Sequence, residues 1–100
     1  MTAILKQPDK GPEIVEVENT LEDLQWYVEG CIEVLTLSED VVIIVNDEGR
    51  INGMPFNFWF CGMDLYGPAL IVGRDGEEFT DLSAGARELI MRALKGVSQC

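Results

Sequence analysis

The chain has 100 residues, 47% of them hydrophobic and 25% charged, a balance that is typical of one small globular domain and excludes a disordered chain. The formal net charge is −11 and no histidine is present, which excludes histidine-based catalytic triads, histidine general bases and most transition-metal sites. No apolar run is long enough to span a membrane and the first residues lack a signal-peptide pattern, so we expect a soluble, cytoplasmic protein.

The negative charge is concentrated in the first half of the chain. Residues 1–48 contain twelve of the eighteen acidic residues and two of the seven basic ones, whereas residues 49–100 contain six and five. Direct binding to nucleic acid is disfavoured, because phosphate contacts require clustered cations. An acidic half instead favours a protein partner with a basic surface, and the alternative is that the acids serve only solubility.

The first elements in the chain are predicted to be a hairpin. Residues 3–6 form a short, mostly apolar run that ends in Lys6, and a turn rich in proline and glycine follows. Residues 13–18 alternate between apolar and acidic side chains as a half-buried strand does. In this strand Glu16 and Glu18 point outward and form an acidic ridge.

A helix is predicted next, with Asn19 or Thr20 as its N-cap and Gly30 at its end. The helical period gives it a buried face formed by Leu21, Leu24 and Val28. Trp26 lies on the opposite face between Glu22 and Glu29, and a large aromatic side chain among carboxylates is typical of a hot spot for a protein partner. The predicted partner-binding residues are therefore Trp26, Glu22, Glu29, Glu16 and Glu18. The alternative is that Trp26 packs under a neighbouring loop.

The middle of the chain combines a buried strand with dense turn chemistry. Residues 31–37 are predicted to form a strand, and residues 41–45 form a second one, which is apolar on both faces. Asparagine, glycine and proline punctuate residues 46–55, and the aromatic run at residues 56–60 either covers one end of the sheet or lines a pocket. A ligand pocket here would be built from Asn46, Arg50, Asn52, Asn57 and Trp59.

A second hairpin and a final helix are predicted to complete the chain. Residues 69–73 and 78–80 form the hairpin, and residues 84–95 form the helix. The apolar face of this helix is predicted to be Ala86, Leu89, Ile90, Ala93 and Leu94. Residues 97–100 are predicted to be a loose tail.

The residues that would carry catalysis or bind a metal are largely missing. The three cysteines are Cys31, Cys61 and Cys100, which are too widely spaced for a zinc site, and we interpret them as free thiols. Asp47 and Glu48 lack the further ligands of a calcium loop. No glycine-rich phosphate-binding motif occurs. We therefore expect no catalytic residue, no metal, no cofactor and no enzyme activity.

One pattern in the middle of the chain resembles that of a known family. Asn46-Asp47-Glu48-Gly49-Arg50-Ile51-x-Gly53-x-Pro55-x-Asn57, together with patterns at residues 17–30, 32–34 and 71–83, resembles a family of small acidic proteins described only as a domain of unknown function. Such proteins are typical of bacteriophages, plasmids and conjugative elements of Gram-positive and gut bacteria. The resemblance implies an accessory protein of a mobile element and no known activity. The chain departs from the pattern at Phe58-Trp59-Phe60.

These patterns predict an α+β fold in a single domain over residues 1–100. We expect the order hairpin, helix, two strands, an irregular crossing loop that contains the aromatic run, hairpin and helix. The sheet should be mostly antiparallel with five to six strands, and both helices should pack on one face. The predicted function is non-enzymatic: a phage or mobile-element protein that binds a basic host protein, with an anti-defence or nucleic-acid-mimic role. Two alternatives are a protein that sequesters a small ligand, with Arg50 holding an anionic group, and a homo-oligomer joined through strand edges or the aromatic run.

Overall fold

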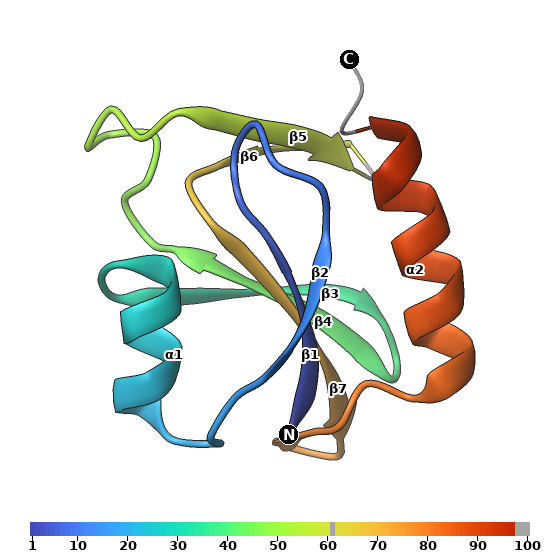
Figure 1. The fold of residues 1–100 in the computed structure, drawn as a ribbon. Coiled ribbons are helices and arrows are strands. Elements are labelled where there is room, and N and C mark those ends of the chain that lie inside the picture. Colours follow the sequence, from blue (N-terminus) through green and yellow to red (C-terminus); the bar gives the residue numbers. More distant parts are fainter. Residues whose placement is uncertain (61, 98–100) are drawn as a thin grey trace.

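The computed structural model describes residues 1–60 and 62–97 and shows an α+β fold (Figure 1). The elements in chain order are β1 (Thr2–Lys6), β2 (Glu13–Glu16), α1 (Leu21–Val28), β3 (Ile32–Ser38), β4 (Val41–Asn46), β5 (Phe56–Phe60), β6 (Met63–Tyr66), β7 (Ala69–Asp75), β8 (Glu78–Thr80) and α2 (Ala84–Val97). Six strands form one sheet in the order β2-β1-β7-β4-β3, with β8 also paired to β7, and β5 pairs with β6 in a second, smaller sheet. All of these pairings are antiparallel.

Strands β4 and β7 form the middle of the large sheet because their sequences are apolar at consecutive positions. All six residues of β4 are buried, and so are the first five of β7. Val42 lies opposite Val72 and Ile44 opposite Leu70 between these two strands. A strand that is apolar on both faces is stable only where both faces are covered.

The two helices cover opposite faces of the large sheet, as Figure 1 shows. Ile43 of β4 lies in a buried cluster with Ile90 of α2, and this cluster also includes apolar residues of β5 and β6. Ile44, the next residue, lies in a second cluster with Leu24 and Val28 of α1. The prediction that both helices pack on one face is therefore wrong. The continuous apolar run in β4 exposes hydrophobic surface on both sides, so each side needs its own cover.

Helix α1 begins where its sequence predicts. The Thr20 hydroxyl accepts a hydrogen bond from the Asp23 backbone N–H at 3.2 Å, as an N-cap does. The left-handed residue that ends the helix is Glu29, with φ of 65°, and not the predicted Gly30. Leu21 is exposed, which corrects its predicted place in the core. Helical side chains lean toward the N-terminus, so the first residue of α1 leans past the start of the helix.

The aromatic run forms a strand, where the sequence predicted an irregular loop. In β5, Phe58 is buried in the same cluster as Leu65 of β6, so the hairpin covers one end of the large sheet. Trp59 points to the opposite side and is exposed, because successive residues of a strand alternate between its faces. The run therefore covers the core with one face and presents aromatic surface with the other.

Helix α2 packs on the sheet through a stripe that includes Ile90 and Leu94, which are buried. Leu89 and Ala93 are exposed, so two of the five residues predicted for the apolar face of α2 lie on its solvent side. The predicted loose tail began at residue 97. Val97 is the last residue of α2, and residues 98–100 lie outside the described residues. In the part of the chain that is described, neither helix is long and apolar enough to cross a membrane.

Candidate functional site

The outer face of α1 carries two of the predicted partner-binding residues, and a third follows directly after the helix. Glu22 and Trp26 lie one turn apart on α1, Glu29 is the left-handed residue that ends it, and all three are exposed. We call these three residues the acidic helix face. Trp26 is 72% exposed, so it does not pack under a loop. Leu24 and Val28 fix the opposite face of α1 to the sheet and thereby keep Trp26 directed outward.

The Trp26 ring is supported on one side by its neighbour in the sequence. The rings of Trp26 and Tyr27 meet edge to face, with centroids 5.0 Å apart and an interplanar angle of 88°. Tyr27 is half-buried and packs against the core beneath α1. This contact limits the motion of the indole, which lowers the entropy that Trp26 would lose on binding a partner.

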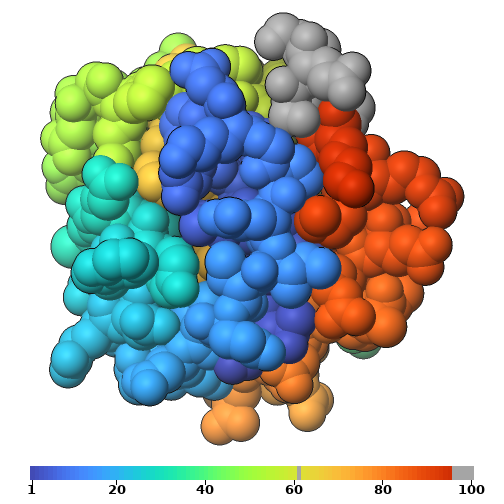
Figure 2. All heavy atoms as spheres, viewed as in Figure 1, coloured from blue at the N-terminus to red at the C-terminus, as the bar shows by residue number. Residues whose placement is uncertain are grey.

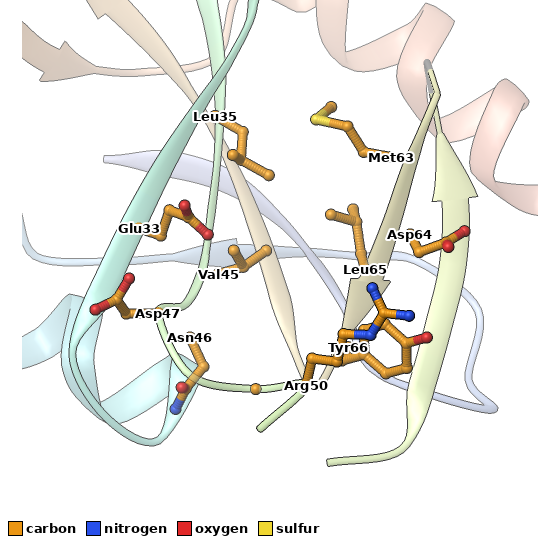
Figure 3. A pocket seen from close by; sticks show the side chains of 11 residues that line it. Glu33, Leu35, Val45, Asn46, Asp47, Arg50, Met63, Asp64, Leu65 and Tyr66 are labelled. Atoms are coloured by element: carbon orange, nitrogen blue, oxygen red, sulfur yellow. The ribbon is translucent and has the colours of Figure 1, made fainter. Parts of the chain in front are cut away.

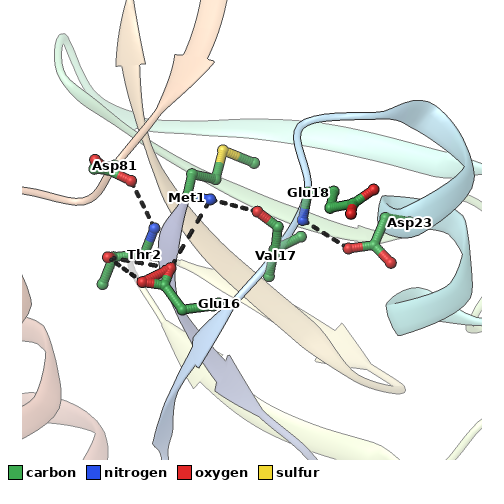
Figure 4. A network of polar contacts seen from close by, with 7 residues as sticks. All are labelled: Met1, Thr2, Glu16, Val17, Glu18, Asp23 and Asp81. Carbon is green, nitrogen blue, oxygen red and sulfur yellow. Dashed lines mark hydrogen bonds and ion pairs between the residues drawn. The ribbon is translucent and has the colours of Figure 1, made fainter.

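Glu16 ends β2, and Glu18 lies in the connection from β2 to α1 (Figure 4). The Glu16 carboxylate accepts a hydrogen bond from the Thr2 hydroxyl at 3.0 Å and lies 3.9 Å from the N-terminal ammonium group. The backbone N–H of Glu18 donates to the Asp23 carboxylate at 2.8 Å, and the Glu18 side chain is exposed. Glu16 thus has a local structural contact, whereas the Glu18 side chain remains exposed.

The β2 segment and α1 lie beside each other on one face of the molecule. Figure 2 shows residues 11–20 next to residues 21–28 on the surface turned to the viewer. Val17 is buried in the same cluster as Leu24, which fixes the two segments to each other. Glu18 therefore adjoins α1, whereas Glu16 bonds to Thr2, which shares a face of β1 with Ile4 on the side of the sheet that α2 covers. The structure does not bring Glu16 onto the surface around the acidic helix face.

Asn46, a predicted ligand-pocket residue, has a structural role in the fold. Its side-chain Nδ2 donates to the Val28 carbonyl at 3.1 Å and to the Glu29 carbonyl at 3.2 Å, and its Oδ1 accepts from the Glu48 backbone N–H at 2.8 Å. Asn46 is buried and packs against Gly30, where a Cβ would lie 2.6 Å from Asn46 Nδ2. Both amide protons are therefore used to satisfy carbonyls at the C-terminus of α1.

Asn57, another predicted pocket residue, connects three segments of the fold. Its Nδ2 donates to the Lys6 carbonyl at 2.6 Å and to the Gly67 carbonyl at 2.7 Å, and its Oδ1 accepts from the Lys6 ammonium group at 2.9 Å. These contacts join β5 to β1 and to the turn before β7. The Asn57 amide is thus used in the fold and is not directed into a ligand site.

Lys6 is a buried charged residue that was not among the predicted site residues. It is only 1% exposed, and its ammonium group donates to the Gln7 carbonyl at 2.8 Å and to Asn57 while lying 5.7 Å from the centre of the Phe58 ring. Burial lowers the Lys6 pKa below its ordinary value, and the nearby Asp9 carboxylate partly opposes this shift. The one signal in the sequence is a lysine that ends an otherwise apolar strand. Because Lys6 is closed off from solvent, we assign it a structural role.

Arg50 is one of two predicted pocket residues that line a hollow. Its guanidinium lies 5.5 Å from the centre of the Tyr66 ring, and the cleft beside it has a volume of about 230 Å³ (Figure 3). Asn46 also lines this cleft. The structure does not place Asn52, Asn57 or Trp59 among the lining residues, so the five predicted residues do not form one pocket.

Cysteine and carboxylate side chains are the metal ligands that remain in a chain without histidine. Within residues 1–60 and 62–97, no group of three or more Cys, Asp or Glu side chains is arranged to hold a metal ion. Cys31 is an exposed free thiol. Cys61 and Cys100, which were also predicted to be free thiols, lie outside the described residues.

Comparison with known proteins gives a family but no characterised relative. No curated protein and no solved structure shows significant similarity to the chain. One protein family, described as a domain of unknown function (DUF3846), matches residues 1–95. This match covers every strand and all but the last two residues of α2. The chain belongs to the DUF3846 family.

Proposed function

We propose that this chain is a non-enzymatic accessory protein of a phage or another mobile element, which binds a basic host protein in the cytoplasm of a bacterial cell through the acidic helix face. The observation that carries the proposal is Trp26, 72% exposed between Glu22 and Glu29. Tryptophan is one of the residue types enriched among those that dominate the affinity of protein interfaces.

The charges around Trp26 define the kind of partner. The net charge of −11 raises the rate of encounter with a basic protein and opposes contact with nucleic acid. In the bound state Trp26 supplies apolar contact area, while Glu22 and Glu29 pair with cations at the rim, where solvent-exposed ion pairs contribute little affinity but fix orientation.

The mobile-element context rests on the resemblance of the sequence pattern around residues 46–57. A mobile element gains from a protein that occupies the cationic surface of a host defence or nucleic-acid-handling protein. Carboxylates presented on a rigid helix can take the place of phosphates on such a surface. The proposed partner is therefore a bacterial protein whose binding surface is rich in lysine and arginine.

The experiment is a pull-down from bacterial host lysate at low and moderate salt, with wild-type protein and matched variants. We expect one basic protein to be recovered stoichiometrically, and its yield to fall as salt rises. Trp26→Ala and Glu22→Lys should lose it. Trp59→Ala and Glu77→Lys, which change an exposed tryptophan and an exposed glutamate elsewhere, should retain it.

Circular dichroism of each variant shows whether the fold is intact. If Trp26→Ala and Glu22→Lys are folded and recover the partner at the wild-type level, the acidic helix face is not the binding surface. If all four variants lose the partner equally, the interaction depends on general charge or stability, and the proposed site is rejected.

A further inference from the structure

The cleft beside Arg50 lies between the β3–β4 edge of the large sheet and the β5–β6 hairpin (Figure 3). Its volume of about 230 Å³ is below the range of roughly 300–1,000 Å³ typical of drug-sized ligands, so an occupant would be a small molecule. The apolar side chains that line it are Leu35, Val45, Met63 and Leu65. These provide a hydrophobic floor between two walls of secondary structure.

Glu33 places one carboxylate at the edge of this floor. In the β3–β4 ladder Glu33 is paired with Val45, and it shares a face of β3 with Leu35, two residues on. Both neighbours line the cleft, so Glu33 is directed toward the same side, and Figure 3 shows it there. On the opposite wall Asp64 also lines the cleft, on the same face of β6 as Tyr66, and Figure 3 shows its carboxylate turned outward from Leu65.

Arg50 places a positive charge on the same cleft. Its guanidinium lies over the Tyr66 ring, which fixes its position by a cation–π contact. No acidic group of the described residues lies within 4.0 Å of it, although the chain has eighteen acidic residues. An arginine that is positioned but not paired has its five donors available for a planar anion such as a carboxylate.

We propose that this cleft binds a small zwitterion of the amino-acid class with an apolar side chain. Arg50 pairs with the ligand carboxylate, Glu33 pairs with the ligand ammonium group, and the apolar body of the ligand packs on Leu35, Val45 and Leu65. Asp47 lies at the rim and adds to the field that favours the ammonium group. This site is separate from the acidic helix face and does not depend on the proposed protein partner.

Both charges of the ligand are needed to match the cleft. A simple anion would meet Arg50 but would be repelled by Glu33 and Asp47. A simple cation would meet these two carboxylates but would be repelled by Arg50. A ligand without an apolar body would leave the floor of the cleft exposed to water.

The experiment is an NMR titration of the ¹⁵N-labelled protein with leucine, methionine and phenylalanine. Two analogues of leucine test its charges: isoamylamine lacks the carboxylate, and 4-methylpentanoate lacks the ammonium group. We expect leucine to shift the amide signals of residues around Glu33, Val45 and Arg50. It should bind at least about tenfold more tightly than either analogue, the ratio that corresponds to one lost charge pair.

Variants assign the two ends of the ligand. Arg50→Gln should weaken leucine binding about tenfold but should not weaken isoamylamine binding, because it removes the charge that repels a simple cation. Glu33→Gln should weaken leucine binding but should not weaken 4-methylpentanoate binding, because it removes a charge that repels a simple anion. Arg92→Gln, on the exposed side of α2, is the matched control and should bind as wild type does. The proposal is overturned if no amino acid shifts these signals at millimolar concentration, if isoamylamine binds as tightly as leucine, or if Arg50→Gln has no effect.

Discussion

Lys6 and Asn57 bind each other twice, across 51 positions of the sequence. The Lys6 ammonium group donates to Asn57 Oδ1 at 2.9 Å, and Asn57 Nδ2 donates to the Lys6 backbone carbonyl at 2.6 Å. Lys6 ends β1 of the large sheet and Asn57 lies in β5 of the small one. This reciprocal contact therefore fixes the position of the hairpin that forms one wall of the cleft.

The first prediction is that Asn57→Ala lowers the free energy of unfolding by about 2–3 kcal/mol, because several partly or fully buried polar groups lose their partner at once. These are the Lys6 ammonium group and the carbonyls of Lys6 and Gly67. Urea denaturation measures the loss. Asn52→Ala, which changes an exposed asparagine, should alter the same quantity by less than about 0.5 kcal/mol. Equal effects of the two substitutions would contradict the structural role of Asn57.

The second prediction concerns pH. The Lys6 pKa is lowered in the folded state by burial, from an ordinary value of 10.5 that holds in the unfolded chain. Between the folded pKa and 10.5 the unfolded chain therefore binds more protons, so the contribution of Lys6 to stability rises with pH across this window. Below the folded pKa both states are protonated, and the cost of burying the charge is present in full.

The measurement is the free energy of unfolding of wild type and Lys6→Met at a series of pH values from neutral to 10.5, the ordinary lysine pKa. The difference, wild type minus variant, should shift in favour of wild type as pH rises. Lys10→Met removes an exposed lysine and is the control for general charge effects. A difference for Lys6→Met that stays constant or moves the other way would show that Lys6 does not titrate as its burial requires.

The third prediction tests the close contact between β7 and the segment after β8. A Cβ added at Gly73 would lie 2.4 Å from the backbone oxygen of Asp81, so the backbone would have to move. Gly73→Ala should therefore cost at least about 1–3 kcal/mol, as overpacking of a core does. Gly11→Ala has no atom within 4 Å of the new Cβ and should be neutral or slightly stabilising. Thermal unfolding of both variants gives the comparison, and similar melting temperatures would contradict the close packing at Gly73.

The sequence predicts the helices and strands of this fold better than it predicts which of them pack against each other. Five consecutive apolar residues at 41–45 identify the central strand, and Thr20 identifies the start of α1, because both signals are local. The side of the sheet that each helix covers depends on residues far apart in the sequence. Helix α2 carries apolar residues at both 89 and 90, and only the packed structure shows that Ile90 faces the core.

The roles of the asparagines also depend on contacts between residues that are far apart in the sequence. Asn46 and Asn57 have the chemistry of ligand-binding residues, and nothing near them in the sequence indicates another use. Their partners are Val28 in α1 and Lys6 in β1, which only the fold brings close. Conversely, the cleft uses Glu33, a strand residue with no distinguishing local pattern, because the β3–β4 register places it beside Val45.

The fourth prediction separates stability from binding on α1. Leu24 is buried and Trp26 is 72% exposed, two residues apart on the same helix. Leu24→Ala should lower the free energy of unfolding by about 2–5 kcal/mol, because it leaves a cavity beneath the helix. Trp26→Ala removes a larger side chain but should change stability by no more than about 0.5 kcal/mol, since its surface is already in water.

Urea denaturation of both variants provides the test. A small effect for Trp26→Ala would mean that the fold does not need this tryptophan, which leaves its exposed ring available for the proposed partner. If Trp26→Ala instead destabilises the protein as much as Leu24→Ala does, the indole supports the fold through Tyr27. The acidic helix face would then lose the residue expected to supply most of its affinity.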